Sequence, residues 1–423
     1  MNGSPPLARL PLPALFTAAL LLVATAGCDR SADPAATNES VAVAGAMGSG
    51  DTTGYARATS PRPFSFPEDH GPHPGFKTEW WYVTGNLDTP KGQHLGYQFT
   101  IFRIAMAPPD SSEALVQPAS TASDTAAAAS DWRTDQFYMA HLAVSDVRDE
   151  RHYDFERFAR GAAGLAGARA EPFRVWTEGW QMAEQDSAGD ADIFPLRLTA
   201  QAGGSNGAKS VALDLRLTSA KEKVLQGERG LSQKGPGAGN ASFYYSFTRL
   251  PTEGTVAADG DTLRVRGPSW MDREWSTSAL GKEQAGWDWF ALQLSGGREL
   301  MYYQLRQKGG APSAYSEGVL VGPRGEVTHL TREDVALDVL EQWTAESGAT
   351  YPAKWRLRVP SENLDLTVTP YFENQVMNTS VRYWEGAVRV EGSAGGSASG
   401  SGYVELTGYG EEGEGKEGRG MLP

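Results

Sequence analysis

The sequence predicts an almost entirely β protein made of two units. Hydrophobic residues recur with a period of two rather than 3.6, and Gly, Pro, Thr, Val and aromatic residues are abundant. Many short apolar stretches are separated by turn-forming residues, a pattern that β-sandwiches and β-barrels share. At roughly 100–200 residues per domain, a chain of 423 residues favours two domains once its ends are set aside.

The N-terminus has the features of an export signal. Residues 10–26 form a largely apolar run, and small residues lead from it to Cys28, the only cysteine. This arrangement resembles a bacterial lipoprotein cleavage site, so we predict a signal peptide over residues 1–28 and a lipid on Cys28. The alternative is an ordinary signal peptide with an incidental cysteine. Residues 29–60 are rich in Ala, Ser, Gly, Thr and Asp, which predicts a flexible tether.

The first unit, residues 61–250, opens with a segment rich in Gly and Pro that enters a strand at Glu79, Trp80 and Trp81. Consecutive strand side chains point to opposite faces. One indole is therefore expected to fill a core, and the other to pack on a second layer or to line a cavity. Further strands are expected at 95–101, 138–147, 173–180, 211–217 and 243–249, with an inserted surface loop at 108–130.

The second unit, residues 251–410, is predicted to follow a boundary at 251–261. It contains two tryptophan-rich stretches, 270–275 and 286–290. Strands are expected at 300–306, 335–340, 355–359, 364–368, 384–390 and 403–407. The Glu/Gly-rich residues 411–423 are predicted to be a disordered tail.

The tryptophan-rich stretches hold the strongest chemical signal. Clustered carboxyl groups in an apolar, aromatic setting can have raised pKa values and act as acids. The alternative is that Arg273 and the indole N–H groups neutralise these carboxyls in a purely structural role. The cluster comprises Asp272, Glu274 and Asp288 among Trp270, Trp275, Trp287 and Trp289, with Tyr302, Tyr303, Trp384 and Glu385 as candidate neighbours.

Other candidate sites are more scattered. Glu79 either lies among aromatic residues at a cavity or pairs with Lys77 or a loop N–H. His70, His73, His141 and Glu79 are residue types that bind zinc, but they are spread along the chain, which favours an interior, hydrogen-bonded His141 over a metal site. A formal nucleophile-elbow pattern at 203–207 lies in a polar loop rather than between a strand and a helix. The formal net charge of −14, without a basic tract, argues against nucleic acid as a partner.

Five motifs together resemble one known family. They lie at 66–87, 138–141, 269–305, 383–388 and 402–409, and the similarity spans roughly residues 62–410. The sequence resembles the carotenoid 1,2-hydratase-like family, in its secreted AttH-type branch. The resemblance implies two tandem lipocalin-like antiparallel β-barrel domains, and no metal or organic cofactor.

The resemblance also implies a chemistry. Hydratases of this family add water to an isoprenoid double bond, with an acid that protonates the alkene and aromatic faces that stabilise the cation. Their Asp-His-Asn-Trp element corresponds here to Asp272, Arg273, Glu274 and Trp275, and their Tyr-x-Asp element to 303–305. Arg273 replaces the His and Leu305 replaces the Asp, which weighs against carotenoid hydration itself.

Three functions follow from these expectations. The first is an exported, lipid-anchored protein of the cell envelope, on the periplasmic side of the inner or outer membrane, that binds an apolar lipid or isoprenoid-like molecule in a barrel or at the domain interface. Its ligand-binding residues would be Glu79, Trp80, Trp81, His141, Trp287, Asp288, Trp289, Trp384 and Glu385. The second is a cofactor-independent hydratase or lyase that uses Asp272 or Glu274 as proton donor and Trp275 and Tyr303 to stabilise the cation. The third is an accessory subunit of an envelope ABC exporter.

Overall fold

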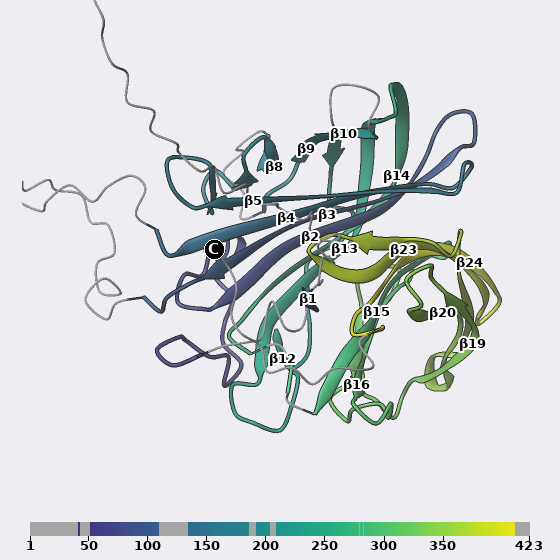
Figure 1. Cartoon of the computed structure of the whole chain (residues 1–423). Coiled ribbons are helices and arrows are strands. Elements are labelled where there is room, and N and C mark those ends of the chain that lie inside the picture. Colours follow the sequence, from purple (N-terminus) through teal and green to yellow (C-terminus); the bar gives the residue numbers. More distant parts are fainter. Residues whose placement is uncertain are drawn as a thin grey trace, which may run out of the picture. The chain divides into compact units, whose positions relative to one another are not determined.

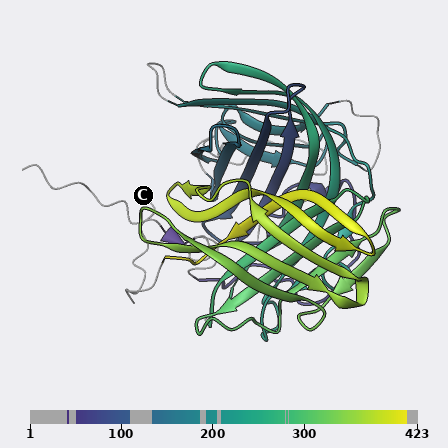
Figure 2. The same cartoon turned by 90° about the vertical axis from the view of Figure 1, so that its right-hand side faces the viewer.

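A computed structural model describes residues 51–109, 134–185, 192–203, 209–278, 280–281 and 283–410, together with the backbone of residues 41–42. Nearly all regular structure in these residues is β, as the sequence predicts, and it forms two antiparallel sheets, each strongly curled (Figures 1 and 2). The predicted signal peptide, Cys28, most of the tether and the 411–423 tail lie outside the described residues. Residues 110–130 of the predicted surface loop and residues 204–208 also lie outside them.

The first sheet is built from the N-terminal half of the chain. Its spatial order is β5-β4-β3-β2-β14-β13-β10-β9-β8-β7-β6, with β11 and β12 paired to β13. The strands are β2 (Thr78–Asp88), β3 (His94–Ala105), β4 (Gln136–Asp146), β5 (Arg151–Arg160), β6 (Ala166–Arg169), β7 (Arg174–Thr177), β8 (Trp180–Glu184), β9 (Leu196–Gly203), β10 (Ser210–Leu217), β11 (Val224–Leu225), β12 (Leu231–Gln233), β13 (Ala241–Ala258) and β14 (Asp261–Ser276).

The second sheet follows in the order β18-β17-β16-β15-β24-β23-β21-β20-β19, and β22 and the short parallel β1 (Val41–Ala42) pair with β23. Its remaining strands are β15 (Gln284–Leu294), β16 (Glu299–Gln307), β17 (Glu317–Val321), β18 (Val327–Leu330), β19 (Ala336–Thr344), β20 (Thr350–Val359), β21 (Leu364–Pro370), β22 (Val376–Asn378), β23 (Val381–Ala394) and β24 (Ser397–Leu406).

Two predicted boundaries differ from the structure. Residues 251–261 do not separate two units, because they belong to the long hairpin of β13 and β14 in the first sheet. Apart from the short β1, the chain enters the second sheet only after Ser276. The folded part also begins before residue 61, since Ala58 is buried and the Tyr55 hydroxyl donates to the Ala105 carbonyl at 2.9 Å.

Each curled sheet encloses its own packed core. Inward-facing residues of β2, β3, β13 and β14 fill the first, including Trp81, Phe99 and Trp275, whereas Trp355 and Trp384 fill the second. The outward-facing residues of the same strands form a third apolar layer where the two sheets meet. The expected division of the two adjacent indoles is confirmed, because Trp81 lies in a core and Trp80 lines a cavity in that third layer.

A buried charge cluster ties the lead-in segment to the first core. Glu79 is fully buried and accepts hydrogen bonds from Arg103, Arg273 and the backbone N–H of His73. Burial opposes ionisation of Glu79, but the two guanidinium groups hold its pKa well below its usual range. Arg273 also lies 4.0 Å from the Trp81 ring centroid, and the His73 ring stacks on Trp275 at 3.8 Å. Glu79 therefore pairs inside the first sheet, not with Lys77.

The helical content of the described residues is limited to two single turns, Glu68–His70 and Pro360–Glu362. Within those residues no helix has the length and apolar character needed to cross a membrane.

Removing the charge of Glu79 should destabilise the protein strongly. In Glu79→Gln two buried guanidinium groups lose their counterion, and breaking a buried ion pair in this way costs about 3–5 kcal/mol. The free energy of unfolding from urea titration measures the loss. Glu341→Gln is the matched control, because Glu341 pairs with Lys354 on the surface and such pairs contribute under about 1 kcal/mol. Equal losses in the two variants would contradict the structural role given to Glu79.

Candidate functional site

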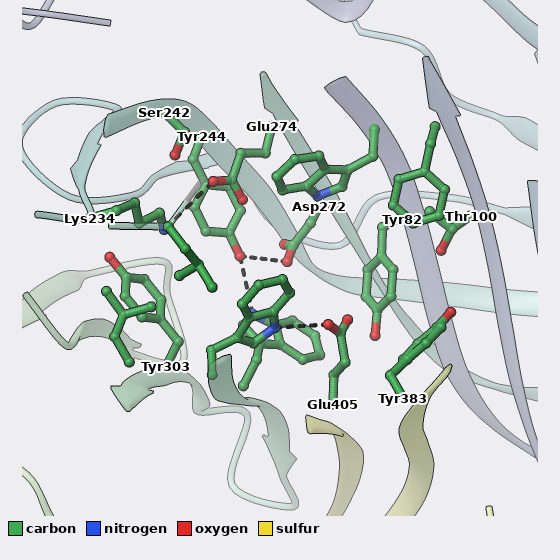
Figure 3. Close-up of a pocket in the computed structure, with 16 residues that line it drawn as sticks. Tyr82, Thr100, Lys234, Ser242, Tyr244, Asp272, Glu274, Tyr303, Tyr383 and Glu405 are labelled. Atoms are coloured by element: carbon green, nitrogen blue, oxygen red, sulfur yellow. Dashed lines mark hydrogen bonds and ion pairs between the residues drawn. The ribbon is translucent and has the colours of Figure 1, made fainter. Parts of the chain in front are cut away.

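A cavity of about 90 Å³ lies where the outer faces of the two sheets meet. Its walls come from β2, β3, β13 and β14 of the first sheet and from β15, β16, β23 and β24 of the second (Figure 3). The strand alternation that fills each core with one set of side chains directs the other set into this space. The lining residues are Trp80, Tyr82, Thr100, Phe102, Lys234, Ser242, Tyr244, Asp272, Glu274, Leu280, Trp287, Trp289, Tyr303, Leu305, Tyr383 and Glu405.

Two rows of register partners form the opposite walls. On the first sheet, Ser246, Asp272, Tyr82 and Thr100 are successive neighbours across four strands. On the second sheet, the row is Tyr303, Trp289, Glu405 and Glu385. Directly paired side chains of antiparallel strands lie close together on one face, so neighbouring members of each row can interact with one another.

Asp272 is the acid of the first wall. It is 4% exposed and accepts hydrogen bonds from Ser246 Oγ and Trp270 Nε1 on one oxygen and from the Tyr244 hydroxyl on the other, at 2.5–2.6 Å. Burial raises the pKa of Asp272 to about 7, although the three hydrogen bonds favour the ionised form. This carboxyl group therefore changes its charge near neutral pH.

An ion pair closes one end of the cavity. Lys234 Nζ lies 3.6 Å from Glu274 Oε1, donates a hydrogen bond to Ser232 Oγ at 2.9 Å, and lies 3.8 Å from the centroid of the Tyr303 ring. Burial raises the pKa of Glu274, while Lys234 opposes that effect. The Tyr303 hydroxyl donates to Glu317 at 2.8 Å, so its ring, rather than its proton, faces Lys234.

A second carboxyl pair lies in the opposite wall. Glu405 accepts a hydrogen bond from Trp287 Nε1 at 2.8 Å, and its register partner Glu385 accepts one from the Tyr82 hydroxyl. Glu385 is fully buried, and its Oε2 has no hydrogen-bond partner. Burial, followed by the charge of Glu405, raises the pKa of Glu385, and burial raises that of Glu405. Two carboxylates this close cannot both ionise easily, so the pair favours a bound proton.

The structure brings together about half of the residues that the sequence singled out. Six line the cavity: Trp80, Asp272, Glu274, Trp287, Trp289 and Tyr303. Glu385 lies directly beside it through Tyr82 and Glu405.

The other predicted site residues lie elsewhere. Glu79, Trp81 and Trp275 belong to the first core, and Trp384 belongs to the second. Asp288 points to the opposite face of β15, where it binds Arg306 and the Tyr409 hydroxyl. His141 lies behind the wall and bonds the Tyr383 hydroxyl at 2.8 Å, and burial lowers its pKa to about 3, which keeps its ring neutral.

Four important wall residues were not predicted as site residues: Tyr82, Lys234, Tyr244 and Glu405. Lys234 lies in a Gly-rich segment between β12 and β13, outside every motif that the sequence analysis singled out. Glu405 had a usable signal, because it is a charged residue between the apolar Val404 and Leu406 of a strand. Its strand was expected, but its position opposite Asp272 depends on sheet packing that no local pattern encodes.

The four residues of zinc-binding type do not converge on one site. His73 and Glu79 are in contact, but His70 bonds Tyr245 and His141 bonds Tyr383. Among the residues that the structure describes, no group of three or more His, Cys, Asp or Glu side chains could hold a metal ion.

Two curled antiparallel sheets with a cavity between them define a tandem lipocalin-like protein. The chain belongs to the AttH-like family, whose model matches residues 57–409. The crystal structure of a putative AttH from Nitrosomonas europaea is 30% identical, covers 84% of this chain and 99% of its own, and superposes with a TM-score of 0.67. Kievitone hydratase from Nectria haematococca shares the fold at 13% identity, with 85% and 98% coverage and a TM-score of 0.58. The comparison with curated proteins gives no match.

The titration of Asp272 should appear in the pH dependence of stability. An unfolded Asp ionises near pH 3.8, whereas the folded group does so near 7. The folded state binds one more proton than the unfolded state between these two pKa values. The free energy of unfolding should therefore fall by a few kcal/mol as pH rises from about 4 to 7, at about 1.4 kcal/mol per pH unit. Urea titrations at several pH values should show that Asp272→Asn lacks this component.

Ser246→Ala serves as the matched variant for that measurement. It removes one donor to the carboxylate, so the fall in stability should extend to higher pH than in the wild type. An unchanged pH profile in Asp272→Asn would contradict the raised pKa.

Proposed function

We propose that this protein binds an apolar, unsaturated small molecule of the lipid or isoprenoid class in the cavity between its two sheets. The observation that carries the proposal is the wall itself, in which indole and phenol rings from both sheets surround a partly enclosed space. Apolar sites with a few placed polar groups are typical of small-molecule binding. Both cores are filled by their own side chains, which favours the interface over the barrel interiors as the binding site.

A second candidate function is the addition or removal of water at a double bond of that ligand. The specific observation in its favour is that carboxyl groups with raised pKa values face the aromatic wall, as acid catalysis of alkene hydration requires. Aromatic rings can stabilise the cation that forms, and side chains alone can carry the protons. A hydratase with the same fold, kievitone hydratase, is compatible with this proposal.

Ligand binding should depend on the indoles of the cavity. In Trp287→Ala the wall loses a large ring, and farnesol, an isoprenoid probe, should bind about tenfold more weakly, in line with roughly 1.5–3 kcal/mol for one buried apolar side chain. Isothermal titration calorimetry measures the affinity. Trp176→Ala is the control, because Trp176 lies on β7 outside the cavity under Arg174. Equal affinity for farnesol in both variants would exclude the cavity as the binding site.

The place of action is proposed from the N-terminal sequence. A lipid on Cys28 would anchor the protein in the cell envelope on the periplasmic side, where it would meet membrane-derived apolar molecules. An envelope ABC exporter is the proposed partner for cargo transfer, and co-purification with a membrane complex would support that role.

Membrane attachment should be lost in Cys28→Ser, because the thiol that carries the lipid is absent. Fractionation of cells that express the full chain measures the distribution between membrane and soluble fractions. Retention of Cys28→Ser in the membrane fraction would exclude lipidation as the anchor.

A further inference from the structure

The two walls of the cavity hold their carboxyl groups in opposite hydrogen-bonding environments. Asp272 projects from β14 of the first sheet and Glu405 from β24 of the second, and both side chains enter the same space (Figure 3). Neighbouring carboxyl groups with different surroundings can divide the roles of acid and base between them. The donors around each group decide which role it takes.

All three hydrogen bonds to Asp272 come from groups whose surroundings or chemistry make them donors. Trp270 Nε1 can only donate. The Ser246 hydroxyl accepts from Gln226 Nε2 at 2.8 Å, so its own hydrogen is free to point at Asp272. The Tyr244 hydroxyl accepts from Trp289 Nε1 at 3.3 Å and likewise donates to Asp272. Three oriented donors favour the carboxylate form of Asp272 and oppose the rise in its pKa that burial causes.

The Glu385–Glu405 pair has the opposite environment. Glu405 receives a hydrogen bond from Trp287, and Glu385 interacts with the hydroxyl groups of Tyr82 and Tyr383. Glu385 Oε2 is buried without a hydrogen-bond partner, an environment that favours the neutral form of the pair. Glu405 is the member that lines the cavity. A proton held by the pair is therefore available to a bound molecule through Glu405.

Other titratable groups surround the same space. Glu274 and Lys234 pair with each other at one end, and their charges offset. The phenols that face the cavity have pKa values raised by burial, which keeps them neutral; they are Tyr82, Tyr244, Tyr303 and Tyr383. Asp272 and the Glu385–Glu405 pair are the wall carboxyl groups to which the described residues provide hydrogen bonds but no ion pair.

We infer that Glu405 is the proton donor of the cavity and Asp272 its proton acceptor, with Glu385 as the positioning residue that keeps the proton on Glu405. This inference rests on the hydration function proposed above as the second candidate. It differs from the expectation drawn from the sequence, in which Asp272 or Glu274 gives the proton.

With these roles, water adds to the double bond in two proton transfers and one C–O bond formation. The Glu405 O–H bond breaks as its proton bonds to one alkene carbon, using the π electrons of the double bond. The other carbon becomes cationic, and the oxygen of a water molecule bonds to it. Asp272 takes the proton that this oxygen releases. The net change is one water added and one proton moved from Glu405 to Asp272, which exchange with solvent reverses. Elimination of water follows the same steps backwards.

Infrared spectroscopy of the full chain tests the two protonation states without a substrate. The wild type is titrated from about pH 5 to pH 9. One band of a buried protonated carboxyl group, that of Asp272, should disappear near neutral pH, whereas a second band, that of the Glu385–Glu405 pair, should persist to higher pH. The persistent band should vanish in the Glu385→Gln/Glu405→Gln double variant and survive in Asp272→Asn. In Glu385→Gln alone, the Glu405 band should ionise at lower pH, a shift that a merely structural role would not produce. A persistent band that vanishes in Asp272→Asn would overturn the assignment.

Two probes that differ in charge test whether Asp272 presents a carboxylate to a ligand in the cavity. N,N-Dimethylgeranylamine is cationic near neutral pH and mimics the cation, whereas geranyl methyl ether is its neutral counterpart. The amine should bind wild type at least tenfold more tightly than the ether, because the Asp272 carboxylate faces it. Asp272→Asn should abolish that preference, and Glu405→Gln should retain it.

The outcomes distinguish a wrong assignment of the proton donor and acceptor from a failure of the proposed ligand binding. A preference lost in Glu405→Gln and retained in Asp272→Asn would overturn the division of roles. If neither probe binds wild type, the proposed binding function fails, and the infrared bands alone decide whether the acid and base are assigned correctly.

Discussion

The structure depends on one constraint, the alternation of side chains along antiparallel strands. On β14, Met271, Arg273 and Trp275 point into the first core, while Asp272 and Glu274 point to the cavity. The second sheet repeats the arrangement with its own strands. Because each sheet curls over a core that is already filled, its outer face is left to meet the other sheet. The cavity is thus a product of two sheets whose inner faces are both occupied, and it could not exist on either sheet alone.

Local pattern was sufficient to predict much of the fold. The period of two placed most strands, and the adjacent Trp80 and Trp81 were correctly divided between a cavity and a core. The boundary at 251–261 was misplaced because Pro251 and the Gly residues nearby are typical of linkers. In the structure they occupy a twisted hairpin, where Gly254 adopts a positive φ of 155° and any Cβ would meet the Asp214 carbonyl.

The candidate site was predictable only on one side. The cluster around Asp272 can be recognised from the sequence because its acids and indoles are adjacent there. Glu405 is more than one hundred residues away and meets this cluster only through the packing of β24 against the first sheet. Residues such as Trp275 and Trp384 were grouped with the site by proximity in sequence, yet their odd or even position on a strand sends them into a core. A pattern of residue types does not state which face of a strand is the functional one.

The face of the strand on which each residue lies also decides what the two departures from the hydratase motifs do to the cavity. Arg273 stands where those motifs have His, but it lies on the core face of β14 and neutralises Glu79, so it neither adds a charge to the cavity nor blocks it. Leu305 stands where they have Asp, and it does line the cavity. One carboxyl group is therefore absent from the β16 wall, while Glu405 supplies one from β24 across Trp289. In the hydration proposed above, the acid would therefore lie on β24 instead of β16. The reacting carbons of the ligand would then lie between β14 and β24.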